Sequence, residues 1–297
     1  MSFWIALRYF FSRRNFTLVN IISIITLTSI VFITTSMFLV LAIFNGFGLF
    51  HHNIYQKSTP DLKIEHATKP TFNIDSNLLS ILDFYQADSV INFSKVLERE
   101  IIIQITDKNQ YSESDKQSYA ILKGVDGNYK NIYNDFKSEK DNRPNAIIIE
   151  SDFYDYNFDS FLKNSDLIVA GESLASKIDL KVYSYNQKQA LKIWYLKPNQ
   201  NRFELAYEDD LKLAAIFNFG ESSIDNTIIS EISEIQNMFS FFEYSYIEIK
   251  VNKDLNIIQE KIQNDLGDNF IVKNREQQSP LIFKIIKTEK MVVYLIF

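Results

Sequence analysis

The sequence of 297 residues contains no cysteine and only seven glycines, five prolines and three histidines. Without cysteine the chain has no disulfide, no thiolate metal site and no cysteine nucleophile. Glycine is scarce, and neither a glycine-rich phosphate loop nor a G-x-S-x-G nucleophile elbow occurs. These absences exclude several classes of enzyme, and we predict that the chain is not an enzyme.

Three histidines and one acidic cluster remain as candidates for metal chemistry. The histidines are His51, His52 and His66, and the cluster is Glu150, Asp152, Asp155 and Asp159. Adjacent histidines diverge on a helix or a strand, whereas a zinc site needs three or four ligands at helix or hairpin spacing. The acidic cluster lacks the glycine of a calcium loop. We therefore predict no metal site, no cofactor and no catalytic residue.

Charge is missing from one long stretch, because no residue between Arg14 and His51 is charged. A bilayer core is crossed by roughly 20 apolar residues, so this run is long enough to cross it. It is also longer than the apolar region of a signal peptide, and no small-residue cleavage pattern follows it. We predict an uncleaved transmembrane helix and its extension within residues 15–50.

The basic flank of this run predicts its orientation. Trp4, Arg8, Arg13 and Arg14 indicate an interfacial helix over residues 1–14 on the cytoplasmic side of the membrane. Residues 51–280 then lie outside the cytoplasm. Residues 281–297 are again apolar but too short to cross a bilayer, so we expect the start of a second transmembrane helix in a fragment of a longer protein.

Alternating strand and helix patterns in residues 51–280 predict an α+β domain with a β-rich insertion at roughly 100–220. Most of the negative charge of the chain, which is −6 overall, lies in this region, so we predict no binding to nucleic acid. The predicted strands are 61–65, 89–106, 119–123, 147–150, 167–170, 191–196, 203–207, 211–219, 226–230, 246–251 and 270–273. The predicted helices are 75–85, 129–136, 171–180, 232–242 and 255–266.

Five segments in order resemble a known family. They are "ALRYFFSRRN", the Ile- and Ser-rich run ending in "NGF" with the strand "PDLKIE", "LIVAGESLASKIDLKVYS", "LAAIFNFGESSIDNTIISEISEIQNMF" and "FKIIKTEKMVVYLIF". Together they resemble the LolC/LolE-type lipoprotein-releasing permeases of the wider MacB/FtsX-like class of ABC-transporter permeases. The resemblance covers nearly the whole chain.

This resemblance implies a membrane-anchored fold with one transmembrane helix, a MacB-like periplasmic domain split into an α/β part and a β-rich part, and further transmembrane helices. It implies that the protein extracts lipoproteins from the outer leaflet of the bacterial inner membrane and couples ATP hydrolysis by a partner to motion of its outer domain (mechanotransmission). The implied partners are a cytoplasmic ABC ATPase, a second permease subunit, lipoprotein cargo, membrane lipid and a periplasmic carrier protein.

In the family the outer half of the first transmembrane helix lines a cavity for acyl chains. Carried over to this sequence, the resemblance implies a candidate wall of Met37, Val40, Leu41, Phe44 and Phe47. Ordinary contact with lipid is the alternative interpretation of these side chains. For the whole protein, the alternatives are an exporter of another amphiphile, an FtsX-like regulator of cell-wall enzymes, or a membrane-anchored sensor or binding module.

Overall fold

The structure is a computed structural model, and it divides into two units, residues 1–52 with 281–297 and residues 53–280. The described residues are 4, 18–106, 116–133, 167–180, 189–197, 202–220, 222, 224–281, 283–284, 287–288 and 291. The strand predicted at 147–150 and the acidic cluster lie outside them.

The apolar run forms one continuous helix, α2, Leu18–Ser58. Over Asn20–Phe50 it is the one helix in the described part of the chain that is long and apolar enough to cross a membrane. The hydroxyls of Thr26 and Thr34 each donate a hydrogen bond to the backbone carbonyl four residues earlier, at 2.8 and 2.9 Å. These polar groups are therefore satisfied within the helix. At about 1.5 Å per residue α2 is roughly 60 Å long, twice the thickness of a hydrocarbon core.

The larger unit, the body, confirms the predicted α+β class. Its nine-stranded sheet has the order β3-β7-β4-β6-β5-β2-β8-β1-β9, and β2 also pairs with β3. One portion, the sheet part, consists of β2, β8, β1 and β9, paired antiparallel in that order. Its elements are β1 (Leu62–His66), α3 (Ser76–Ala87), β2 (Ile91–Thr106), β8 (Tyr246–Val251), α8 (Leu255–Leu266), η2 (Gly267–Asn269), β9 (Phe270–Asn274) and α9 (Arg275–Gln278).

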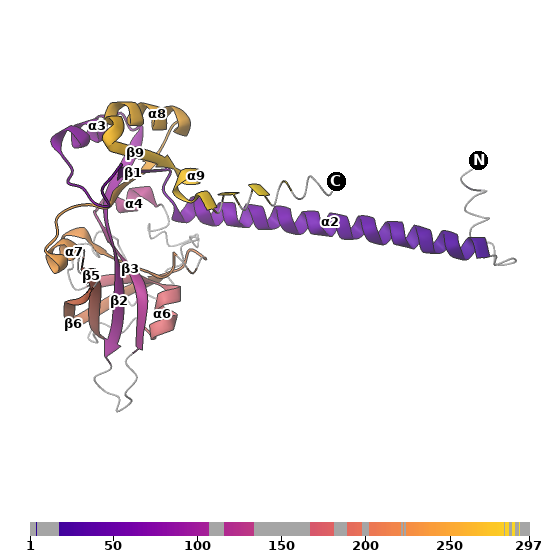
Figure 1. Ribbon diagram of the computed structural model, residues 1–297, viewed down its shortest axis with the longest axis horizontal. Helices are drawn as coiled ribbons and strands as arrows, with labels where there is room; N and C mark the ends of the chain where they lie inside the picture. The colour runs from indigo at the N-terminus through magenta and orange to yellow at the C-terminus, as the bar shows by residue number, and fades with distance from the viewer. Residues whose placement is uncertain are drawn as a thin grey trace, which may run out of the picture. The chain divides into compact units, whose positions relative to one another are not determined.

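The chain order strand-helix-strand, twice, makes the sheet part a split βαβ arrangement. Figure 1 shows α3 and α8 lying together over β1 and β9. Both helices start at an aspartate cap: Asp75 accepts the Leu78 N–H at 2.8 Å, and Asp254 accepts the Asn256 N–H at 3.1 Å. Their apolar faces cover strand residues that are fully buried. This core includes Leu62, Ile64, Leu78, Leu82, Ile91, Ile247, Ile249, Ile258 and Ile262.

The free edge of β9 is covered by side-chain amides from α8. Gln263 donates to the Phe270 carbonyl at 2.9 Å and accepts the Val272 N–H at 2.8 Å. Gln259 donates to the Val272 carbonyl at 2.8 Å. Because an uncovered edge strand invites pairing with another chain, these two glutamines take the place of a further strand.

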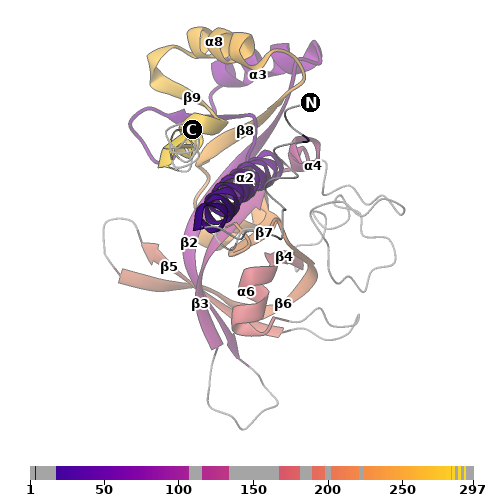
Figure 2. The same ribbon diagram turned by 90° about the vertical axis from the view of Figure 1, so that its right-hand side faces the viewer.

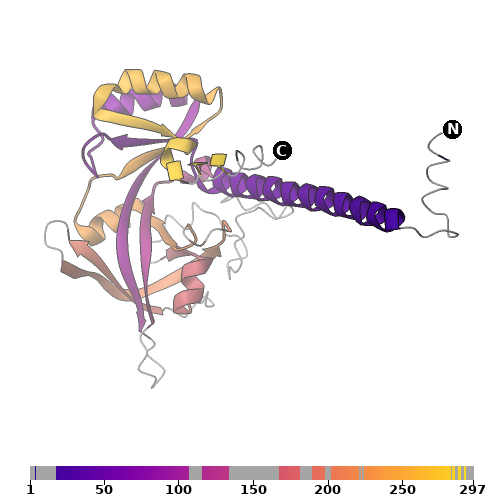
Figure 3. The ribbon, with the colours of Figure 1, turned by 45° about the vertical axis from the view of Figure 1, so that its right-hand side comes forward.

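The second portion, the ring part, is a closed circuit of strands. From β2 the pairing runs through β3, β7, β4, β6 and β5 back to β2. Figure 2 shows these strands with α6 among them, and Figure 3 shows β2 running the length of the body. The bounds are β3 (Lys116–Val125), α4 (Tyr129–Ile132), β4 (Leu167–Gly171), α6 (Glu172–Ile178), β5 (Gln189–Lys197), β6 (Arg202–Phe217), β7 (Thr227–Glu231) and α7 (Ile232–Phe239).

Residues from every strand of the ring fill its core, among them Ile101, Ile103, Leu122, Ile193 and Ile228, each less than 2 % exposed. Each strand pairs with a neighbouring strand on both sides over part of its length, and this pairing closes the ring. Two predicted strands are wrong as separate elements: 203–207 and 211–219 form the single strand β6. The predicted helix 232–242 ends earlier, at Phe239, where Ser240 adopts a left-handed conformation (φ 49°).

Candidate functional site

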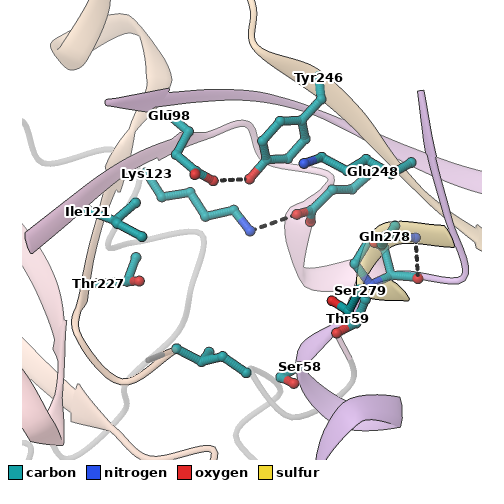
Figure 4. Close-up of a pocket in the computed structure, with 13 residues that line it drawn as sticks. Ser58, Thr59, Glu98, Ile121, Lys123, Thr227, Tyr246, Glu248, Gln278 and Ser279 are labelled. Atoms are coloured by element: carbon teal, nitrogen blue, oxygen red, sulfur yellow. Dashed lines mark hydrogen bonds and ion pairs between the residues drawn. The ribbon is translucent and has the colours of Figure 1, made fainter. Parts of the chain in front are cut away.

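A cavity of about 320 Å³ lies in the body. Figure 4 shows its polar lining. The lining residues are Ser58, Thr59, Pro60, Lys63, Glu98, Ile121, Lys123, Ile224, Thr227, Tyr246, Glu248, Gln278 and Ser279. They come from β1, β2, β3, β7 and β8, from the turn before β7, and from the two segments that connect the body to the apolar ends of the chain. The cavity therefore lies where both connecting segments enter the body.

These two connecting segments are bound to each other by Asp61, Arg275 and Gln278, which we call the clamp. The guanidinium of Arg275 lies 2.7 Å from the carboxylate of Asp61, and its Nε donates to the Thr59 carbonyl at 3.2 Å. Gln278 donates to the Pro60 carbonyl at 3.2 Å. The clamp thus ties the residues directly after α2 to the residues that lead into the second apolar segment.

The clamp is also fixed to the sheet. The second carboxylate oxygen of Asp61 accepts the Val251 N–H at 2.8 Å. Gln278 donates in addition to the Lys273 carbonyl at 3.2 Å. The side chains of Asp61 and Arg275 are 14 % and 28 % exposed. This half-buried ion pair is screened less than one on an open surface, and its additional hydrogen bonds fix its geometry.

The lining of the cavity also includes a buried ion pair. Lys123 Nζ lies 2.6 Å from Glu248 Oε1, and the two side chains are 13 % and 3 % exposed. Burial by itself lowers the pKa of Lys123, but the negative charge of Glu248 and the hydrogen bond to it raise the pKa above its ordinary value. Lys123 is therefore a permanent cation near neutral pH.

Aromatic rings surround the Lys123 ammonium. It lies 5.0 Å from the ring centre of Tyr129, 5.7 Å from that of Tyr133 and 5.8 Å from that of Tyr246. Tyr246 also donates a hydrogen bond to Glu98. Burial raises the pKa of all three tyrosines, and nearby carboxylate charge adds to this effect. At such distances each ring attracts the cation, so the cluster is held together by charge and aromatic contact.

A second lysine borders the same cluster. Lys63 Nζ lies 3.7 Å from the ring centre of Tyr246 and 2.9 Å from Glu65. Lys273 also binds Glu65. Burial alone would raise the pKa of Glu65, but hydrogen bonds from Lys273 and Lys63 lower it below its ordinary value. Glu65 therefore keeps its charge to lower pH than a free glutamate.

The pKa shifts of the charged and aromatic residues around the cavity do not favour proton transfer. A general acid or base works best when its pKa lies near the working pH. Here the pKa of Lys123 and of its three tyrosines is raised, and that of Glu65 is lowered, so each shift holds the group in its ordinary protonation state. In the described residues no group of three or more histidine, aspartate or glutamate side chains is placed to hold a metal ion.

His66 has a local structural role. Its Nδ1 accepts the N–H of Thr68 at 3.2 Å and that of Lys69 at 3.3 Å. Its ring packs against Phe72 and Phe270, with centroids 6.3 and 5.6 Å away. His51 and His52 lie in α2, and nothing is described of their side chains. The histidine of the body thus closes the turn after β1.

The candidate wall residues all lie on α2. The spacing of Met37, Val40, Leu41, Phe44 and Phe47 places them along one side of the helix. Met37 and Leu41 are half-buried and the other three are exposed. A role in lining a substrate cavity stays a prediction. Of the predicted interface residues, Trp4 is exposed, while Arg8, Arg13 and Arg14 lie outside the described residues.

Two segments that carry the family resemblance meet in the ring part. Gly171, the last residue of β4, packs directly on the backbone of Asp225: a Cβ on Gly171 would lie 2.2 Å from the Asp225 carbonyl oxygen. That carbonyl accepts the Leu174 N–H at 3.1 Å. The Asp225 carboxylate accepts the N–H groups of Phe219 at 2.8 Å and Gly220 at 3.2 Å. The glycine and the aspartate are thus packing residues.

The sequence did not indicate the clamp or the buried cluster. Asp61 and Arg275 are far apart in the chain, yet Asp61 directly precedes β1 and Arg275 directly follows β9. Since β1 and β9 are antiparallel neighbours, the start of one strand meets the end of the other. A pairing of these two strands, if predicted, would have brought the two charges together.

No protein-family model matches this sequence, and no curated protein matches it. Solved structures do resemble it. The extracellular domain of the noncanonic ABC-type transporter YknZ from Gram-positive bacteria is 10 % identical with a TM-score of 0.43, over 72 % of this chain and 99 % of that one. The periplasmic region of MacB from Actinobacillus actinomycetemcomitans is 13 % identical with a TM-score of 0.44, over 77 % and 95 %.

A domain of a putative permease from Porphyromonas gingivalis is 12 % identical with a TM-score of 0.36, over 73 % of this chain and 89 % of that one. All three identities are too low to transfer a substrate or a partner. The likeness therefore concerns the fold alone, which this chain shares in part with an extracellular domain, a periplasmic region and a permease domain.

Proposed function

We propose that this chain belongs to a permease subunit of an ABC transporter in the bacterial inner membrane, with its body outside the cytoplasm. The class follows from the five ordered segments of the sequence that resemble lipoprotein-releasing permeases. The structural observation that carries the proposal is the connection of one long helix to a clamped body. This arrangement suits the transmission of motion rather than catalysis.

The helix α2 is a continuous 41-residue element, and the clamp binds Thr59, Pro60 and Asp61, which directly follow it, to the residues after β9. A helix resists bending because each turn is hydrogen-bonded to the next. The residues after β9 are held by the same clamp through Gln278. In the proposed mechanism, movement of the first transmembrane helix therefore moves the sheet part and the second apolar segment with it.

Motion is required because affinity alone cannot extract a lipid-anchored cargo. Burying a methylene of an acyl chain is worth about 0.8 kcal/mol relative to water, but almost nothing relative to lipid. A wall formed by Met37, Val40, Leu41, Phe44 and Phe47 would therefore bind acyl chains without pulling them out. In the proposal, ATP hydrolysis by a partner subunit closes this space, which is a shift between two packings.

The proposed cargo is lipoprotein, and the proposed partners are an ABC ATPase, a second permease subunit and a periplasmic carrier. The test is to purify the tagged protein from its native membrane in mild detergent and to identify what accompanies it by mass spectrometry. An ATPase, a sister permease and lipoproteins are the expected companions. Cell-wall hydrolases would instead support the FtsX-like regulator, and a purification without any ATPase would contradict the transporter and support the sensor.

A further inference from the structure

The sheet part and the ring part share β2, and the pairing of this strand changes where they join. Along one edge, β2 pairs with β8 through Ile91–Val96 and with β5 through Ile101–Thr106. Within the described residues no strand pairs with residues 97–100 on that edge. Here the hydroxyl of Ser245 accepts the Glu98 N–H at 3.0 Å and donates to the Glu98 carbonyl at 3.2 Å.

Residues 242–245 also lead the chain from the ring part back into the sheet part, and Ser245 N–H donates to the Val96 carbonyl at 2.9 Å. Within the part of the chain that the structure describes, these two crossings between the parts lie side by side, joined by one serine. A strand that lacks a partner strand on one edge over several residues bends more easily than one paired on both edges. The junction therefore has the geometry of a hinge.

The buried ion pair bridges this junction. Lys123 belongs to β3, in the ring part, and Glu248 belongs to β8, in the sheet part. The ring centres around the lysine are also shared: Tyr129 and Tyr133 follow β3, whereas Tyr246 lies on β8. The cavity of about 320 Å³ lies beside the pair, so packing does not fill the space next to it.

We infer that Lys123 and Glu248 form a latch that holds the ring part and the sheet part in one relative orientation about a hinge at residues 97–100. A buried ion pair adds little net stability compared with well-packed apolar side chains, but it satisfies both charges in only one arrangement. A relative rotation of the two parts would separate these charges in a place where water screens them little. The inference does not depend on the proposed transport function, and its test needs no partner protein.

The chain has no cysteine, so two introduced cysteines give unique positions for spin labels. Asn264 on α8 and Asn237 on α7 are exposed and lie in the sheet part and the ring part. We would label N237C/N264C in the full chain and measure the distance distribution by pulsed electron paramagnetic resonance. A single narrow distribution is expected. A broad one would overturn the latch, because it would show that the intact pair does not fix the orientation.

Three variants of this labelled chain complete the test: K123M, E248L and K123M/E248L. Each is expected to give a broader distribution with a displaced second population, because the charged bridge is gone. A single variant that leaves one buried charge unpaired can fail to fold, which circular dichroism would detect. The double variant leaves neither charge of the pair without its partner, so its distance distribution tests the latch when a single variant does not fold. A folded double variant with the distribution of the parent chain would overturn the proposal.

K116M is the matched control. Lys116 lies on the same strand as Lys123 and forms an ion pair with Asp179 at 3.0 Å, but both side chains are about half exposed and both lie in the ring part. Its removal is expected to leave the distance distribution unchanged. A distribution that broadens equally in K116M and K123M/E248L would contradict a specific role for the buried pair.

Discussion

Replacement of Gly171 by alanine is predicted to destabilise the ring part strongly. The new methyl group would lie 2.2 Å from the Asp225 carbonyl oxygen and 2.5 Å from its carbonyl carbon. These atoms belong to backbone, so no side-chain rotation relieves the contact. Asp225 must shift, although its carbonyl and its carboxylate together accept three backbone N–H groups, from Leu174, Phe219 and Gly220.

The cost follows from these contacts. Overpacking of a tight site costs typically 1–3 kcal/mol, and each weakened hydrogen bond adds about 1 kcal/mol. We expect a loss of about 3 kcal/mol in the free energy of unfolding. For a domain of this size, that lowers the midpoint of thermal unfolding by roughly 6–12 °C.

The assay is scanning calorimetry of the protein and two variants, G171A and G127A. Gly127 is the control, since a Cβ there meets no atom within 4 Å and its φ is not in the left-handed region. G127A is expected to change the free energy of unfolding by less than about 1 kcal/mol. Equal unfolding temperatures for the two variants would refute the argument that close packing on Asp225 requires a glycine at position 171.

Two further predictions concern the sheet part. Q263L leaves the Val272 N–H and the Phe270 carbonyl without their partner. In urea unfolding we expect it to lower the free energy of unfolding by about 1–3 kcal/mol, and we expect it to promote self-association through the edge of β9. Q263E should retain part of the stability, because its carboxylate still accepts the Val272 N–H. Burial and the hydrogen bond to Asp265 raise the pKa of Tyr85 to about 12, so Tyr85 stabilises the fold below pH 10 and loses this contribution between pH 10 and 12. Between pH 10 and 12 the unfolding temperature of Y85F should fall less than that of the parent protein. An identical fall in the two proteins would contradict the role given to Tyr85.

Much of the fold could be predicted because its signals are local. The aspartates before α3 and α8 and the apolar spacing after them indicate each helix, and strict alternation indicates β8. The closed ring could not be predicted, because its pairings join strands far apart in the sequence. The charged residues 208–210 interrupt an apolar pattern and predict a break, yet β6 runs through them, paired with β5.

The site was less accessible to sequence reasoning. Lys123 and Glu248 lie within alternating strand patterns, where a charged residue usually faces solvent. Their burial depends on the meeting of the two parts of the body, which no local pattern encodes. The resemblance to a family indicated Gly171 as part of a motif, but its physical reason, the contact with Asp225, needs the folded ring.

The central proposal is that the clamp passes motion of α2 to the body. The most direct test measures lipoprotein release and ATP hydrolysis by the assembled transporter carrying R275L, with the surface variant K116M as control. R275L breaks the contacts of Arg275 with Asp61 and Thr59. The account predicts that R275L folds and still supports ATP hydrolysis but releases much less cargo, while K116M behaves as the parent protein. Undiminished release by folded R275L, or full release without the ATPase, would contradict it.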